Sequence, residues 1–525
     1  MILKERSFSN IIFLCSLTLF AGIVQLPAQY QNIKVGNAIN AYEPEEPSIV
    51  INPMNTDHIL IGSNIDNYYY SMDGGLTWQH GVLNSSYGVN ADPCVLVDGN
   101  GYYYYFHLVP DLSRVVCQKS TSLGGSWSDG SYTGVNLPKD NDKEWAVINR
   151  SNGYMYVTWA QFDEHGSTSY QDSSEILLSR SIDGGLNWSP PVPVSDRKGD
   201  AMGGNNTDHA PMPAIGPNNE VYVTWMGPDG LMFDKSVDDG QTWLDHDINV
   251  SGFHINWLLF NLPGIPITPG FPIINCDLSP GSYNGNIYIC WTDQRSGYND
   301  TDVWVVKSTD GGSTWSTPIR VNDDPSGRHQ FFAWMTIDQT NGYLYFVFYD
   351  RRNYSNSQTD VYMAVSKDGG NTFTNFLVSD SSFIPTANDF IGHYIGVSAH
   401  NNIVRPVWTR IDNRQLSLWT AIVDIESSID ADSQKIFPVN FEITSIYPNP
   451  FNPATTIRYN LSNKGHVKLS VYNSLGQQIE TLVDAVQTRG NHELTWDAKN
   501  LSSGVYLFQL QLGELTNTQK AVLLK

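Results

Sequence analysis

The stretch Ser71-Met72-Asp73-Gly74-Gly75-Leu76-Thr77-Trp78 decides the fold of this chain, because its pattern Ser-x-Asp-x-Gly-x-Thr-Trp recurs along the sequence. Further copies start at Ser181, where Asn187 takes the Thr place, and at Ser236, Ser308 and Ser366. A degenerate copy starts at Ser120 and has Ser122 at the Asp position. The six copies start 49 to 72 residues apart. A motif repeated at such a period indicates a repeat fold.

The motif has the chemistry of a tight turn between two strands. Glycine supplies positive φ at no steric cost, and Asp and Ser side chains bond to nearby backbone N–H groups. The closing Trp or Phe re-enters the next strand. We therefore interpret the motif aspartates as structural turn residues without a catalytic role. They are Asp73, Asp183, Asp238, Asp310 and Asp368.

The motif resembles the Asp box of the BNR repeat, which occurs in sialidases and many other secreted β-propellers. The resemblance covers about residues 30 to 427. It implies an all-β fold in which each repeat contributes one four-stranded blade. It implies less about function, because one fold supports many different sites.

The number of blades follows from the segments around the boxes. Each of the six boxes comes after strand-like runs such as Tyr154–Trp159, and a seventh unit over 393–423 has three such runs and no box. The run Gln31–Val35 can supply the missing fourth strand, which closes the ring and removes both sheet edges. The sequence predicts seven blades, and six remain open if the last unit packs outside the ring.

The N-terminus predicts export from the cytoplasm. Lys4 and Arg6 precede an apolar run over 11–24 and then Pro27-Ala28, the pattern of a cleaved secretory signal peptide over residues 1–28. No other stretch is long and apolar enough to span a membrane. With 53 acidic and 30 basic residues, the net charge of −23 excludes nucleic acid as a partner. We expect no cofactor and no metal site, with Ca²⁺ at Asp-rich loops left open.

The C-terminal region predicts a second, smaller module. A polar linker over 428–440 follows the propeller region of 29–427, and residues 441–525 alternate like the strands of a small β-sandwich. The module opens with Tyr447-Pro448-Asn449-Pro450-Phe451-Asn452-Pro453 and contains Ser503-Gly504-Val505-Tyr506. These motifs closely resemble the C-terminal sorting domain of the type IX (Por) secretion system. The resemblance implies handling by that machinery in a Bacteroidetes-like bacterium, followed by release or attachment at the outer-membrane surface.

Candidate site residues are expected on the propeller face opposite the box turns, where loops on a rigid scaffold surround the central channel. We predict His209, His393 and Tyr394 as catalytic residues, because histidine and tyrosine can act as base and acid. Arg295, His329 and Arg352 are predicted to bind a ligand carboxylate or hydroxyl group.

The two arginines also have a structural interpretation. Asp293-Gln294-Arg295 and Asp350-Arg351-Arg352 occupy the same place in two consecutive units. Such recurrence is typical of a loop held by an arginine–carboxylate fork. The sequence leaves open whether either arginine turns inward to a ligand.

The sequence favours a glycan ligand but argues against sialidase activity. Sialidases of this family carry a Phe/Tyr-Arg-Ile-Pro motif in the first blade and have six blades. This chain instead has the acidic segment Tyr42-Glu43-Pro44-Glu45-Glu46-Pro47. We therefore expect a secreted or cell-surface, sialidase-like propeller that binds or processes extracellular glycans. If it is an enzyme, it is a glycoside hydrolase or a polysaccharide lyase. The alternatives are a non-catalytic propeller that binds a glycan or a surface protein, and an exo-sialidase.

Overall fold

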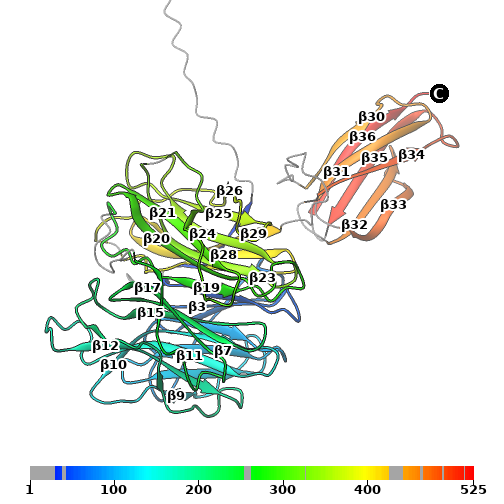
Figure 1. Cartoon of the computed structure of the whole chain (residues 1–525). Coiled ribbons are helices and arrows are strands. Elements are labelled where there is room, and N and C mark those ends of the chain that lie inside the picture. The colour runs from blue at the N-terminus through cyan, green and yellow to red at the C-terminus, as the bar shows by residue number, and fades with distance from the viewer. Residues whose placement is uncertain are drawn as a thin grey trace, which may run out of the picture.

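The computed structural model describes residues 30–37, 39, 43–252, 262–325, 327–388, 390–424, 441–461, 465–487, 490–512 and 515–525. The predicted signal peptide and linker therefore lie outside the described residues. Over these ranges the protein is all-β (Figure 1). They contain no helix, and hence none long and apolar enough to cross a membrane.

The described part of the chain up to Asp424 forms seven antiparallel sheets, each built from four strands in sequential order, with one extra short strand in the third. The first three sheets each consist of one local stretch of chain. Their strands are β2 (Ser48–Ile51), β3 (Ile59–Ser63), β4 (Asn67–Ser71) and β5 (Gln79–Val82); β6 (Cys94–Val97), β7 (Tyr103–Leu108), β8 (Val115–Ser120) and β9 (Ser131–Thr133); and β10 (Asp140–Ile148), β11 (Met155–Phe162), β12 (Ser173–Ser181), β13 (Val192–Pro193) and β14 (Gly199–Asp200).

The next three sheets repeat the same plan, whereas the seventh joins the two ends of this region. The strands are β15 (His209–Ile215), β16 (Val221–Gly227), β17 (Gly230–Ser236) and β18 (Ile248–Ser251); β19 (Ile273–Cys276), β20 (Ile287–Gly297), β21 (Asp300–Ser308) and β22 (Ile319–Arg320); β23 (Gln330–Asp338), β24 (Tyr343–Asp350), β25 (Asp360–Ser366) and β26 (Thr374–Leu377); and β27 (Gly396–His400), β28 (Ile403–Asp412), β29 (Gln415–Asp424) and β1 (Gln31–Gly36).

The first strands of these sheets contact one another in a closed cycle. In order around the cycle they are β27, β2, β6, β10, β15, β19, β23 and again β27. The pairing of β1 with β29 was predicted from the sequence and is confirmed, with Ile33 opposite Thr420. Because β1 and β29 come from the beginning and the end of the seven-sheet region, no turn joins them, which explains why the seventh unit lacks a box.

Each box occupies the turn between the third and fourth strands of its sheet. In the first copy, Ser71 Oγ accepts a hydrogen bond from Gly75 N at 2.8 Å. Asp73 accepts from Thr77 N at 2.9 Å and from Thr77 Oγ1 at 2.6 Å. The backbone bond recurs at Asp183, Asp238, Asp310 and Asp368. The side-chain bond comes from Asn187 at the first of these and from a threonine hydroxyl at the other three. The predicted turn chemistry of the motif is therefore what the structure shows.

The sheets are held together by aromatic side chains from their second strands. Trp159, Trp225, Trp291 and Trp408 take equivalent places in four of these strands and are fully buried. Second-strand residues face a neighbouring sheet on both sides, so β7, β11 and β16 are buried along their whole length. Cys276 and Cys290 lie on neighbouring strands but are free buried thiols, because Cys276 lies opposite Ile287 and not Cys290.

The C-terminal residues form two further antiparallel sheets, drawn in orange and red in Figure 1. Their hydrophobic cluster, which includes Ile443, Phe451, Trp496, Phe508 and Leu523, contains residues of this region alone. The strand orders are β30 (Glu442–Tyr447), β31 (Ala454–Leu461) and β34 (Gly490–Asp497); and β33 (Gln478–Gln487), β32 (Gly465–Asn473), β35 (Gly504–Leu512) and β36 (Leu515–Leu523).

The hydrogen bonds that Asp238 accepts within its box predict that replacing it with Ala lowers the stability of the protein in a pH-dependent way. Burial raises the pKa of Asp238, but hydrogen bonds from Thr242, Ser236 and Gln241 outweigh it and lower the pKa to about 2. This stabilisation is complete above the unfolded pKa, near 4, and is lost as the pH falls towards 2. We expect Asp238→Ala to cost about 1 kcal/mol at pH 6. Urea unfolding at pH 6 and pH 2.5 measures the cost.

The expected difference between the wild type and Asp238→Ala is smaller at the lower pH. The exposed Asp245, changed to Ala, serves as the matched control and is expected to have no effect at either pH. An equal cost of Asp238→Ala at both pH values would contradict this account.

Candidate functional site

The first strands begin with backbone conformations that side chains rarely adopt. Glu46, Asp92, Lys143, Ala210 and Phe332 have φ values of 50 to 57°, in the left-handed region. They lie two residues before Ser48, Cys94, Trp145, Met212 and Trp334, respectively. Strain of about 1–3 kcal/mol per residue persists only where the surroundings enforce it, and it gathers at functional sites. Five such positions at one end of the ring mark this end, called here the mouth, as the candidate site.

Lys143 is the charge around which the mouth is organised. Its Nζ atom lies 2.5 Å from Asp92 Oδ1 and 3.8 Å from Glu46 Oε2. Glu46 also contacts His393, whose Nδ1 atom lies 2.5 Å from Glu46 Oε1, and it accepts a hydrogen bond from Asn64 Nδ2 at 2.9 Å. The network thus joins the starts of the first, second, third and seventh sheets.

A second carboxylate–histidine contact lies next to this network. Asp142, the residue before Lys143, has its Oδ2 atom 3.2 Å from His209 Nε2 and 3.4 Å from His165 Nε2. Burial raises the pKa of Asp142, but Lys143 and the two histidines reverse this and hold it well below its usual range. Asp142 is therefore a charged partner for His209.

The mouth carboxyl groups differ in the direction of their pKa shifts. Burial raises the pKa of Glu46, but Lys143 and His393 outweigh it, so the net pKa is lowered. For Asp92, the effect of burial is larger than the opposing effect of Lys143, so its pKa lies well above the usual value. Burial also raises the pKa of Glu144, whose two carboxyl oxygens have no hydrogen-bond partner among the described residues. Groups with pKa values pushed apart in this way can serve as an acid and a base.

Aromatic side chains close the mouth on the side that faces the centre of the seven sheets. Trp145 and Trp334 have centroids 4.7 Å apart, and Tyr394 lies 5.8 and 5.6 Å from them. Phe271 completes the set at 6.4 Å from Tyr394. A cavity of about 20 Å³ among these rings, Asp92 and Glu144 has room for one water molecule.

The structure brings three of the predicted site residues together. His209 and His393 lie with ring centroids 5.9 and 6.4 Å from Phe271, and Tyr394 packs on the same ring. Phe271 and Asp142 were missed in the sequence analysis. Phe271 follows a Pro- and Gly-rich segment with no periodic signal, whereas the run Asp142-Lys143-Glu144 at a strand start was a readable sign of a charged cluster.

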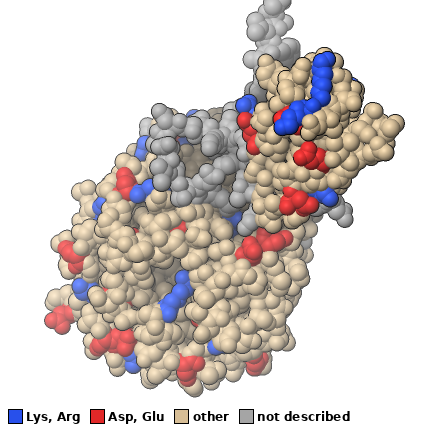
Figure 2. Space-filling view, turned by 90° about the vertical axis from the view of Figure 1, so that its right-hand side faces the viewer, with Lys and Arg blue, Asp and Glu red and all other residues tan. Residues whose placement is uncertain are grey.

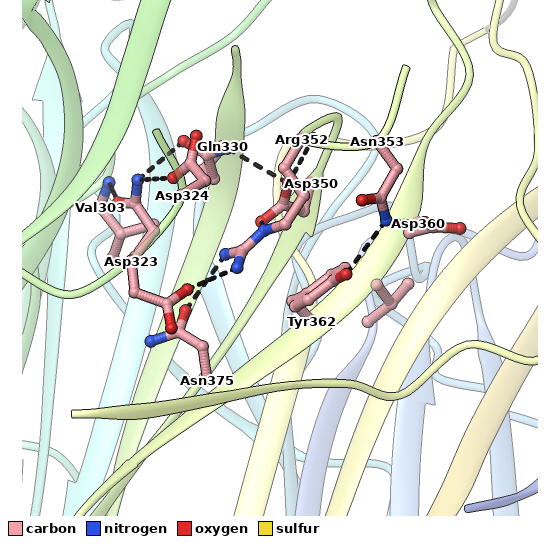
Figure 3. A network of polar contacts seen from close by, with 12 residues as sticks. Val303, Asp323, Asp324, Gln330, Asp350, Arg352, Asn353, Asp360, Tyr362 and Asn375 are labelled. Carbon is pink, nitrogen blue, oxygen red and sulfur yellow. Dashed lines mark hydrogen bonds and ion pairs between the residues drawn. The ribbon is translucent and has the colours of Figure 1, made fainter. Parts of the chain in front are cut away.

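The other three predicted residues are placed elsewhere. Arg295 forks onto Asp293, with Nη2 to Oδ2 at 2.6 Å, and lies over Trp304. Arg352 binds Asp350, Asp323 and Asn375, with Nε to Asp350 Oδ2 at 2.8 Å (Figure 3).

His329 lies beside the fifth sheet. Its Nδ1 atom contacts Thr301 Oγ1 at 3.0 Å. Burial, followed by the charge of Arg351, lowers the pKa of His329 to about 4. It is therefore neutral at physiological pH.

The surface carries charges of both signs. On the face shown in Figure 2, acidic and basic side chains are scattered over the surface and gather into no large patch of one sign. Among the described residues, no group of three or more His, Cys, Asp or Glu side chains is arranged to hold a metal ion.

Comparisons with known proteins identify the C-terminal region. Residues 445–524 match the model of the secretion system C-terminal sorting domain. No curated protein matches the chain. A polysaccharide lyase, described as an ulvan lyase bound to a GlcA–Rha3S saccharide, aligns with 75% of this chain and 96% of its own at 12% identity and a TM-score of 0.47. The α-L-arabinanase of Penicillium chrysogenum aligns with 76% of this chain and 99% of its own, at 11% identity and a TM-score of 0.42.

The Hadza microbial sialidase Hz136 is similar at 13% identity and a TM-score of 0.40, over 70% of this chain and 73% of its own. These likenesses are too remote to assign an activity. The sorting domain does assign a route: the chain is a substrate of the type IX secretion system of Bacteroidetes and is secreted or attached to the cell surface.

Proposed function

We propose that this protein binds and processes a neutral extracellular glycan at the mouth of its ring. One observation carries the proposal. Glu46 and Asp92, two carboxyl groups with opposite pKa shifts, contact one ammonium at strained backbone positions beside exposed parts of aromatic rings. Glycoside hydrolases use two carboxyl groups roughly 5–9 Å apart, one as acid and one as base or nucleophile.

The proposed architecture places this mouth on a seven-bladed propeller over residues 29–427. The closed cycle of first strands supports seven blades, because it leaves none of the seven sheets outside. We further propose a signal peptide over 1–28, a linker over 428–440 and a β-sandwich over 441–525. The two sheets and separate hydrophobic cluster of the C-terminal region support the sandwich.

The proposed roles follow from the charges. Burial raises the pKa of Asp92 well above its usual value, against the opposing effect of Lys143, so we assign to Asp92 the acid that donates a proton to a leaving oxygen. Glu46 remains ionised through Lys143 and His393 and can accept a proton from water or stabilise positive charge on the sugar. Phe271 and Trp145, both half-buried, offer flat faces on which a sugar ring can stack.

The mouth does not suit a sialic acid. Its charged groups are mainly carboxylates, and Lys143 is already shared between two of them. Arg295 and Arg352, the arginines expected to bind a carboxylate, are held by aspartates of their own loops. We therefore propose that the protein is not an exo-sialidase. The shortage of free positive charge also disfavours a lyase acting on a uronate polymer.

A second candidate is a non-catalytic glycan-binding or protein-binding propeller. The burial of the carboxyl pair favours it, since Glu46 and Asp92 are 2% and 3% exposed. Buried ion-pair networks also occur as purely structural elements. In this case the aromatic rings alone would contact the ligand.

A glycan array run beside a hydrolysis screen on neutral glycans, sialosides and uronate polymers tests the proposal. We expect binding of neutral glycans and their slow cleavage, with cleavage reduced at least a hundredfold in Asp92→Asn and unchanged in the exposed control Asp245→Asn. Binding without cleavage would leave the second candidate. Release of sialic acid, or unsaturated products from a uronate polymer, would contradict the proposal.

A further inference from the structure

A second cavity lies within the ring and extends to the end opposite the mouth. It has a volume of about 550 Å³ and is lined by the first strands, including the whole of β2, β19 and β27, and by the turns that follow their carboxyl ends. In an antiparallel sheet these ends lie on the same side as the box turns, so we call it the box-side chamber. Trp145, Met212 and Trp334 line both the chamber and the mouth cavity and form the boundary that the two share.

The chamber walls differ in charge from the rest of the protein. Arg150, His400 and the thiol of Cys276 are the ionisable side chains among the described residues that line it, and no carboxylate does. This contrasts with a chain that has 53 acidic and 30 basic residues. The remaining polar lining includes Asn149, Asn219 and Gln339, whose side chains already bond to neighbouring protein atoms.

Arg150 is a lining residue with several unused hydrogen-bond donors. Its side chain is solvent-accessible, and its guanidinium forms no hydrogen bond or ion pair with any described residue. The charge of Asp98 acts on Arg150, but the two side chains form no ion pair. The Asp98 carboxylate instead accepts hydrogen bonds from Tyr104 Oη at 3.0 Å and from two backbone N–H groups. The surrounding walls lower the pKa of Arg150, a desolvation effect that an anion would relieve.

His400 adds a neutral polar group next to this arginine. Burial lowers the pKa of His400, and the nearby charge of Arg150 lowers it further, against the opposing effect of Asp338. The imidazole is therefore uncharged at neutral pH and can donate one hydrogen bond.

We propose that the box-side chamber binds a small organic molecule through a carboxylate or sulfate group held by Arg150. A guanidinium presents a planar fork that matches such oxyanions. The volume lies within the range of about 300–1,000 Å³ that is usual for small-molecule sites. The site is distinct from the mouth, so it does not depend on the function proposed there.

Calorimetric titration of the mature chain tests the proposal, with glucuronate, sulfate and glucose as probes. We expect glucuronate or sulfate to bind and neutral glucose to bind at least tenfold more weakly. Arg150→Met is expected to weaken anion binding at least tenfold and Arg150→Lys less than that. Arg197→Met, a change at an exposed arginine that pairs with Asp229, is expected to leave binding unchanged.

A second pair of variants keeps the test decisive if Arg150→Met proves unstable. Leu278 lines the chamber and is 40% exposed, so a charge there needs little desolvation. Leu278→Glu is expected to weaken glucuronate binding and Leu278→Lys to strengthen it, each about threefold. The proposal is overturned if glucuronate and glucose bind equally, or if neither anion binds at concentrations up to about 50 mM, which would reveal even a weak site. It is also overturned if the Arg150 and Leu278 variants bind like the wild type.

Discussion

Replacing Lys143 with Met is expected to destabilise the protein by about 3–5 kcal/mol, the usual cost of removing one partner from a buried ion cluster. Lys143 contacts Asp92 and Glu46 and lies close enough to Asp142 for all three carboxyl groups to raise its pKa, although burial alone would lower it. Methionine keeps the volume but leaves charged groups without compensation. Urea unfolding of the mature chain, followed by tryptophan fluorescence, measures the effect.

Two further variants separate charge from packing. Lys198→Met removes an exposed lysine that pairs with Glu175 at 3.0 Å, and it is expected to cost less than about 1 kcal/mol. Adding Glu46→Gln to Lys143→Met is expected to restore part of the loss, because it removes one of the unpaired charges. Wild-type stability of Lys143→Met would show that the mouth carboxyl groups are all neutral, and it would remove the ionised base from the proposed function.

The ring could be predicted from the sequence because its determinants are local. A box such as Ser71–Trp78 bonds within itself, so its sequence specifies its turn wherever it occurs. Closure by Gln31–Val35 was predictable because a three-stranded last unit needs a partner and the N-terminal run has the pattern of a strand.

The candidate site was less predictable because it depends on contacts between sheets. His393 and Glu46 are adjacent only because the ring closes. The left-handed backbone at Lys143 and Ala210 has no signal in residue type, since neither is Gly or Asn. For Arg352, the sequence could not decide between a ligand and Asp350, and the choice follows from the position of Asp323 on a neighbouring loop (Figure 3).

Deleting residues 440–525 is expected to abolish delivery to the medium or cell surface while leaving the rest of the protein folded. The region that matches the sorting domain lies entirely within the deleted segment. Its buried cluster, from Ile443 to Leu523, contains no residue of the ring, so its removal exposes no ring core. The truncated protein should therefore accumulate in the periplasm with the thermal unfolding midpoint of the ring unchanged.

Cell fractionation with immunoblotting measures the distribution, and two controls make the result specific. Trp496→Asp places a charge in the buried cluster beside Phe451 and Phe508, and it should block delivery like the deletion because the sorting module no longer folds. The exposed Leu475→Asp leaves that cluster intact and should be delivered normally. Transfer of residues 441–525 to a periplasmic reporter should carry the reporter out. Normal delivery of the truncated chain would contradict this prediction, because it would place the export signal before residue 440.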